Sequence, residues 1–206
     1  MNTPSRSDRR RAEMVAAAHE MISERGITAL SIRGIAAKIG MSPGSVLYHY
    51  PDIDHLLYDL HRTLVDRYVT RRVHTTAAIP EPPRKIVHMF SSGLPSGSDD
   101  EVCKVLYQLH DLGTRHDRHA ALMTSLWDRE KLLFESIVVA GVASGDFHPS
   151  RPADELAASF LAMEDGLGLH IVSRNASLPR SAALNLLISF ASAELGLGLR
   201  ASAGPR

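Results

Sequence analysis

The stretch SIRGIAAKIGMSPGSVLYHY, residues 31–50, has the pattern of two short helices joined by a tight turn. Ser31 and Ser42 are of the type that caps helix N-termini, and Pro43 falls at a first helical position, where its missing N–H costs nothing. Gly40 lies between the two helices and can adopt the left-handed conformation that such a reversal needs. The stretch therefore predicts a helix-turn-helix unit.

The second of these helices is expected to have small residues at its start and separate buried and exposed sides. Small residues at its start let the backbone approach a phosphate or a base edge closely. A helix this short buries only one side, so Val46, Leu47 and Tyr50 are expected to pack inward, while Tyr48 and His49 project outward.

Upstream of this unit, the segment from Arg9 to Arg25 has apolar residues at helical spacing and ends at Gly26. Residues 1–50 carry seven basic and four acidic side chains, a net charge of +3, whereas the other 156 residues carry 16 and 19, a net charge of −3. A basic head suits a partner rich in phosphate. The side chains expected to contact double-stranded DNA are Arg9, Arg10, Ser31, Arg33, Ser42, Pro43, Gly44, Ser45, Tyr48 and His49.

The order and spacing of Arg25-Gly26, Ile35-Ala36, Gly40-Met41-Ser42, Gly44-Ser45 and His49-Tyr50 resemble the signature of the TetR family of repressors. The resemblance covers residues 9–60. It implies a homodimer that binds a palindromic operator and is released by a small-molecule effector.

Two positions depart from the family pattern. Leu47 stands where the family often has Tyr, and Ile53 where it often has Lys, and the resemblance implies that both positions touch the DNA backbone. Tyr48 or His49 is expected to replace the missing phosphate contact. Further along, residues 143–147, Asp154 and residues 165–167 loosely resemble the regulatory domain of BetI-type members.

The chain has 206 residues, of which 44% are hydrophobic and only 5% aromatic, a balance that favours helices. No stretch alternates with the period of a strand. The prediction is an all-α protein of nine helices, with a DNA-binding domain at 1–50, a connecting helix at 51–78 and a regulatory and dimerisation domain at 79–206. The resemblance implies that the last two helices, at 153–173 and 180–199, form the dimer interface, with Leu161 and Leu187 among its apolar positions.

A largely apolar effector pocket is expected in the regulatory domain, although each candidate taken singly is more often ordinary core. The candidate lining residues are Tyr107, His110, Met123, Trp127, Phe134 and Met163. A metal site at His110, His116 and His119 is a minor alternative, because no cysteine joins these histidines and their stretch is charged. We expect no metal and no cofactor.

Several function classes find no support in the sequence. The lone Cys103 has no activating base nearby, and no nucleophile elbow or glycine-rich phosphate loop is present, so no catalytic residue is expected. The absence of an apolar N-terminal or membrane-length run leads us to expect a cytoplasmic protein. The competing hypothesis is an all-helical small-molecule-binding protein or enzyme whose DNA-binding head has lost its function.

Overall fold

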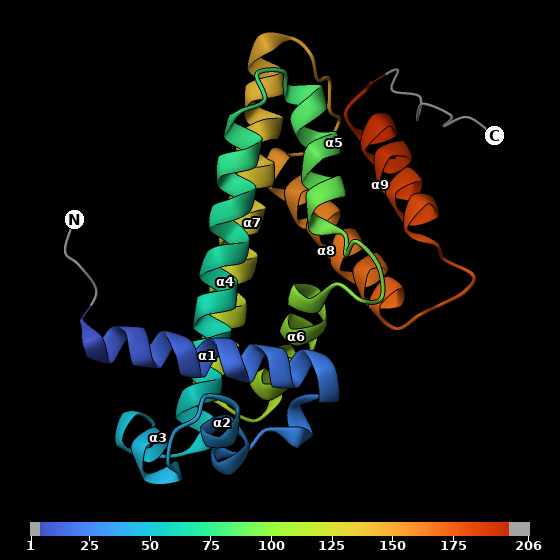
Figure 1. Ribbon diagram of the computed structural model, residues 1–206. Helices are drawn as coiled ribbons and strands as arrows, with labels where there is room; N and C mark the ends of the chain where they lie inside the picture. Colours follow the sequence, from blue (N-terminus) through green and yellow to red (C-terminus); the bar gives the residue numbers. More distant parts are fainter. Residues whose placement is uncertain (1–4, 198–206) are drawn as a thin grey trace. The chain divides into compact units, whose positions relative to one another are not determined.

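The computed structural model describes residues 5–197, and within that range it contains α-helices, two short 3-10 turns and no strand (Figure 1). The all-α prediction is confirmed. The helices are α1 (Arg6–Arg25), α2 (Ile32–Lys38), α3 (Pro43–His49), α4 (Ile53–Ala77), α5 (Pro82–Gly93), α6 (Glu101–His110), α7 (Asp117–Ser144), α8 (Ala153–Val172) and α9 (Arg180–Glu194). None of these described helices is long and apolar enough to cross a membrane.

The helices group into two compact units that do not follow the order of the chain. Unit 1 holds the described residues up to Arg67 together with Glu101–Met123, and unit 2 holds Tyr68–Asp100 together with the described residues from Thr124 onward. The helices α4 and α7 each have residues in both units. The segment containing α6 therefore packs with the N-terminal helices, although 33 residues of unit 2 separate the two pieces of unit 1 in the sequence.

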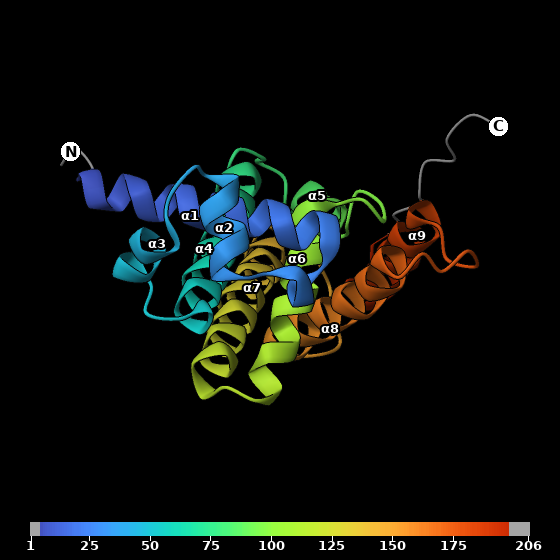
Figure 2. The same cartoon turned by 60° about the horizontal axis from the view of Figure 1, so that its bottom comes forward.

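In unit 1, α2 and α3 pack against each other and against α1 (Figure 2). Helix α1 begins at Arg6, three residues earlier than predicted, because Ser5 and Asp8 form a capping box. The Ser5 hydroxyl accepts the Asp8 N–H at 3.1 Å, and the Asp8 carboxylate accepts the Ser5 N–H at 3.0 Å. Two backbone donors that would otherwise be unsatisfied are thereby paired.

The C-terminal end of α1 is held by α6. Lys104 donates to the Ser23 carbonyl at 3.1 Å, and the Gln108 amide oxygen accepts the Ile27 N–H at 2.8 Å. Gly26, between these two contacts, has a φ of 82°, a conformation that favours glycine. These bonds fix the exit from α1 and thus the start of the helix-turn-helix.

Helices α4 and α5 begin at local sequence signals. Asp52 accepts the His55 N–H at 2.9 Å, as expected of an N-cap. Pro82 and Pro83 occupy the first turn of α5, where the absence of an N–H and the fixed φ suit a helix.

Unit 2 has an aromatic and aliphatic core between α5, α7, α8 and α9. The rings of Phe90, Phe134 and Phe160 pack with centroids 5.5–5.9 Å apart. Leu161 and Leu187 are 1% and 0% exposed within this core, so their prediction as interface residues is wrong. Their apolar faces are buried by neighbouring helices of the same chain. The predicted end of the last helix, Leu199, lies outside the described residues.

An ion cluster lies inside the same unit, surrounded by apolar side chains. Arg72 is 0% exposed and donates both to Glu130 and, through two nitrogens at 2.7 and 3.0 Å, to Glu164. It also donates to the Met89 carbonyl at 2.9 Å. Burial raises the pKa of Glu164 to about 8 despite the opposing pull of Arg72. A side chain on Gly93 would collide with the Glu164 carboxylate, so glycine is needed beside the cluster.

Candidate DNA-binding surface

Helix α3, the predicted reading helix, is held at both ends by its own residues. The Ser42 hydroxyl accepts the Ser45 N–H at 3.1 Å, and the two serine hydroxyls are 2.8 Å apart. Tyr50 caps the other end and donates its N–H to the Val46 carbonyl at 2.9 Å. Because Gly40 adopts a φ of 66°, the chain turns into this helix without strain.

The exposure of α3 side chains confirms part of the predicted division. Val46 and Tyr50 are both 0% exposed, whereas Tyr48 is 85% exposed and His49 is half-buried beside it. Leu47 is 44% exposed, so the prediction that it packs inward is wrong. Within α3 itself only Val46 is buried, because the second buried side chain, Tyr50, belongs to the residue that caps the helix.

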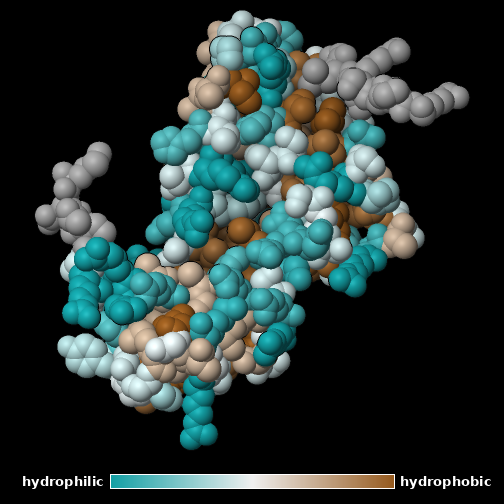
Figure 3. Space-filling view, viewed as in Figure 1, coloured by the Kyte–Doolittle hydropathy of each residue, from teal (hydrophilic) through white to brown (hydrophobic). Residues whose placement is uncertain are grey.

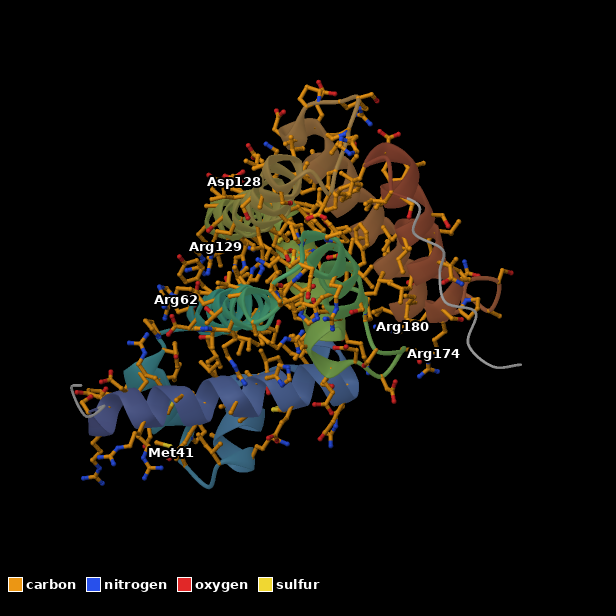
Figure 4. All side chains as sticks on the ribbon, turned by 90° about the horizontal axis from the view of Figure 1, so that it is seen from above. Met41, Arg62, Asp128, Arg129, Arg174 and Arg180 are labelled. Carbon is orange, nitrogen blue, oxygen red and sulfur yellow. The ribbon has the colours of Figure 1, made fainter. Side chains whose placement is uncertain are left out.

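One shallow depression joins α3 to the start of α1. It has a volume of about 650 Å³, and both helices and the preceding turn contribute to its lining. The lining residues are Arg6, Ser7, Arg10, Met41, Ser42, Gly44, Ser45, Tyr48 and His49. Hydrophilic side chains gather over the N-terminal part of α1 (Figure 3), and Met41 lies beside that helix (Figure 4).

The depression is positively charged, because among the described residues its lining includes two arginines and no carboxylate. The Arg10 guanidinium pairs with Glu13 at 2.7 Å, so part of its charge is compensated. Arg6 forms no such pair among the described residues. A concave basic surface with hydroxyls and an exposed tyrosine offers both ionic and neutral donors to phosphate oxygens.

The depression brings together six of the ten predicted DNA contacts, and the other four lie outside it. Ser31 caps α2 by accepting the Gly34 N–H at 3.1 Å. Arg9, Arg33 and Pro43 are exposed. Arg6, Ser7 and Met41 also line the depression but were not among the residues predicted from the sequence. The Ser5-x-x-Asp8 capping box was the available signal for Arg6 and Ser7, since it extends α1 toward the N-terminus.

A separate network ties α1 and α3 to α4 within unit 1. Asp59 accepts a hydrogen bond from the Tyr50 hydroxyl at 2.8 Å and one from Arg11 at 3.1 Å. The Arg11 guanidinium also lies over the Tyr50 ring, 4.7 Å from its centroid. Arg11 is therefore bound to the protein itself, unlike Arg6. The Arg11–Tyr50–Asp59 network fixes the C-terminal end of the reading helix.

The six predicted effector residues are divided between the two units. Tyr107, His110 and Met123 belong to unit 1, while the other three belong to unit 2. Phe134 is 0% exposed in the aromatic core, and Trp127 is 36% exposed. Met163 is partly buried against the core. Their role in binding an effector stays a prediction.

The predicted metal alternative is not supported by the geometry. No group of three or more His, Cys, Asp or Glu side chains among residues 5–197 is arranged to hold a metal ion. His116 and His119 have ring centroids 5.9 Å apart, and the nearest partner of His119 is His61, at 2.9 Å between their Nδ1 atoms. Cys103 is buried, as expected of an inert thiol.

Comparison with known proteins agrees with the geometry of the head. Residues 14–60 match the sequence model of a family described as bacterial regulatory proteins, tetR family. The chain is similar to the HTH-type transcriptional repressor KstR2 of Mycolicibacterium smegmatis, with 23% identity over 153 residues, 74% of this chain and 75% of that protein. KstR2 of Mycobacterium tuberculosis is 21% identical over 145 residues, 70% and 72% of the two chains.

Solved structures share the fold. A transcriptional regulator from Saccharomonospora viridis in complex with choline superimposes with a TM-score of 0.82 and 24% identity, covering 89% of this chain and 96% of that one. A TetR transcription regulator from Haloarcula marismortui superimposes with a TM-score of 0.77 and 18% identity, covering 91% and 97%. At these identities the structures show the fold alone.

Proposed function

Because this chain is a transcriptional regulator of the TetR family, we propose that it acts as a homodimeric repressor that binds a palindromic operator and leaves it when a small molecule binds. The observation that carries the proposal is the basic depression shared by α1 and α3, with Tyr48 exposed on its lining. Two such helices in a dimer would enter successive major grooves about 34–36 Å apart.

The proposed contacts fall into two classes. Arg6 and Arg10 bind phosphates, because guanidinium groups pair with phosphate oxygens and release counterions. Ser42, Ser45 and Tyr48 lie on the helix that would face the groove, where hydroxyl groups can reach base edges or phosphates. The exposed Leu47 offers an apolar surface to a thymine methyl or a sugar.

The dimer is proposed to form through α8 and α9. Once Leu161 and Leu187 are assigned to the core, the large apolar side chains still exposed on these helices are Leu169 and Leu186, at 48% and 50%. Removing such side chains from water favours association. Arg174 lies in the connection between the two helices and Arg180 is the first residue of α9 (Figure 4). Arg180 donates to the Pro95 and Ser91 carbonyls.

The effector is proposed to be a small organic molecule with a largely apolar body, bound in unit 1 with the participation of Tyr107, His110 and Met123. A structural neighbour crystallised with choline supports a small organic effector. Binding of DNA and of effector would oppose each other with equal coupling from either site.

The test is selection of bound fragments from the chain's own genome, followed by fluorescence-anisotropy titration of the enriched duplex. Arg6→Ala and Tyr48→Ala should each weaken binding at least fivefold. Arg84→Ala is the matched control, because this arginine is exposed on α5 in unit 2 and pairs only with Glu81 among the described residues. Failure to enrich any duplex, or equal weakening by the control, would favour a protein whose head has lost DNA binding.

A further inference from the structure

Three histidines from three helices meet inside unit 1. His61 of α4 and His119 of α7 are 0% and 1% exposed, and their Nδ1 atoms lie 2.9 Å apart in a hydrogen bond. The ring of His110, at the end of α6, lies 6.1 Å from that of His61 between centroids. Tyr58 packs edge-on against His119, and Tyr107 against His110. We refer to His61, His110 and His119 as the histidine cluster.

The hydrogen bonding of this cluster is incomplete. A neutral imidazole has one donor and one acceptor nitrogen, and His61 uses only Nδ1. The Nε2 atoms of His61 and His110 are both buried, and neither has a partner. Buried polar atoms in proteins are nearly always paired, so unpaired nitrogens on two neighbouring rings indicate a partner that the chain itself does not supply.

His61 and His110 are neutral at physiological pH. Burial, reinforced by His119 and His110, lowers the pKa of His61 to about 3, and burial lowers that of His110 to about 4. Burial, Arg118 and His116 lower the pKa of His119, and Asp54 opposes them. When His119 donates its Nδ1–H to His61, the Nε2 of His61 carries a proton and is free to donate.

We propose that the two unpaired Nε2 atoms bind one acceptor oxygen of the effector, a ketone or a carboxylate at the end of its apolar body. The two ring centroids lie 6.1 Å apart, and two hydrogen bonds of about 2.9 Å from a single oxygen span at most about 6 Å between donor nitrogens. This inference rests on the proposed function, because it names the chemistry by which the effector is recognised.

The same turn of α4 reaches the DNA-binding head. Asp59 precedes His61 by two residues, and residues two apart on a helix point to nearly opposite sides. One side of this turn therefore contacts the histidine cluster, and the other holds Tyr50 and Arg11 through Asp59. An oxygen drawn in between His61 and His110 would shift this turn and, with it, the end of α3.

The experiment measures release of the enriched operator by a panel of carboxylates, methyl ketones and hydrocarbons that share linear and phenyl-terminated skeletons. We expect release by carboxylates or ketones and none by the hydrocarbon of the same skeleton. Calorimetry in buffers of different ionisation enthalpy separates the two oxygen sources, because a carboxylate raises the pKa of an adjacent imidazole and binds with proton uptake, whereas a ketone does not.

His61→Phe and His110→Phe remove the nitrogens and keep a ring. Each should require at least tenfold more compound for release while binding operator as the unaltered chain does. His74→Phe, an exposed position late in α4, is the control. If His61→Phe fails to fold, His110→Phe carries the test alone. Unchanged responses in both variants, or no release by any oxygen-bearing compound, overturn the inference. If the unaltered chain does not bind any operator, the proposed function is refuted instead.

Discussion

Replacing Arg72 with methionine would remove the guanidinium that lies between two buried carboxyl groups in the core of unit 2. The substitution keeps much of the apolar stem but leaves Glu130 and Glu164 without their guanidinium donor, and it removes one of the donors to the Met89 carbonyl. Breaking one side of a buried ion pair costs about 3–5 kcal/mol, and all three charged groups here are at most 5% exposed. We therefore expect the free energy of unfolding of unit 2 to fall by about that amount at pH 8.

The loss should be smaller at pH 5.5. Burial raises the pKa of Glu164 to about 8 and raises that of Glu130, and without Arg72 both carboxyls will take up protons more readily still. A carboxyl group with a raised pKa in the folded state contributes stability that is present below its unfolded pKa and is lost as the pH rises through the folded pKa. The variant should thus be destabilised most at high pH.

The assay is urea unfolding followed by the fluorescence of Trp127, the chain's single tryptophan, which lies in unit 2. Arg72→Lys retains the charge but not the fork of two donors and should lose less. Adding Glu164→Gln to Arg72→Met should recover part of the loss, since one buried charge is removed with its partner. A loss below about 1 kcal/mol at both pH values would refute the reasoning.

Four further outcomes are expected. Tyr48→Ala should leave the melting temperature nearly unchanged, because substitutions at exposed positions change the free energy of unfolding by no more than about 0.5 kcal/mol. The same variant should weaken operator binding by about 1–3 kcal/mol in an anisotropy titration. Leu47→Ala, at a position that is also exposed, should lower the free energy of unfolding by less than about 1 kcal/mol. Operator affinity should fall steeply between 50 and 200 mM salt, and a flat dependence would argue against phosphate contacts. The double variant Leu169→Glu and Leu186→Glu should sediment as a folded monomer, whereas a persistent dimer would exclude this face. The pKa of His61 is lowered to about 3 from its usual 6.5, so the stability that this histidine contributes is present above pH 6.5 and lost as the pH falls toward 3. A hydrogen-exchange measurement in which α4 and α6 gain protection on acidification would contradict this expected loss of stability.

Local signals in the sequence predicted the helices well, because caps and breakers act over one or two turns. Ser31, Ser42 and Asp52 each accept the backbone N–H expected of an N-cap. The start of α1 was placed too late because the Ser5–Asp8 capping box went unrecognised. Pro82 marks the start of α5, because the first turn of a helix accepts proline.

Contacts between distant residues could not be read in this way. The exposure of Leu47 depends on how closely α1 and α2 approach α3, which the pattern of a seven-residue helix does not specify. No local pattern marks Glu164 as a member of an ion pair, because its partner Arg72 lies 92 residues earlier in the chain. His119 was paired with histidines near it in sequence, whereas its hydrogen bond goes to His61.

Unit 1 is built from two separate segments of the chain, which affects how the protein folds during synthesis. A ribosome releases the N-terminus first, at about 5–20 residues per second, so Met123 follows Arg67 by roughly 3–11 s. During that interval the exit from α1 lacks the bonds from Lys104 and Gln108, and the His61 ring lacks its partner from α7. The nascent head must wait for the later helices to emerge, which makes the delay between the two pieces a period of exposure to chaperones and proteases.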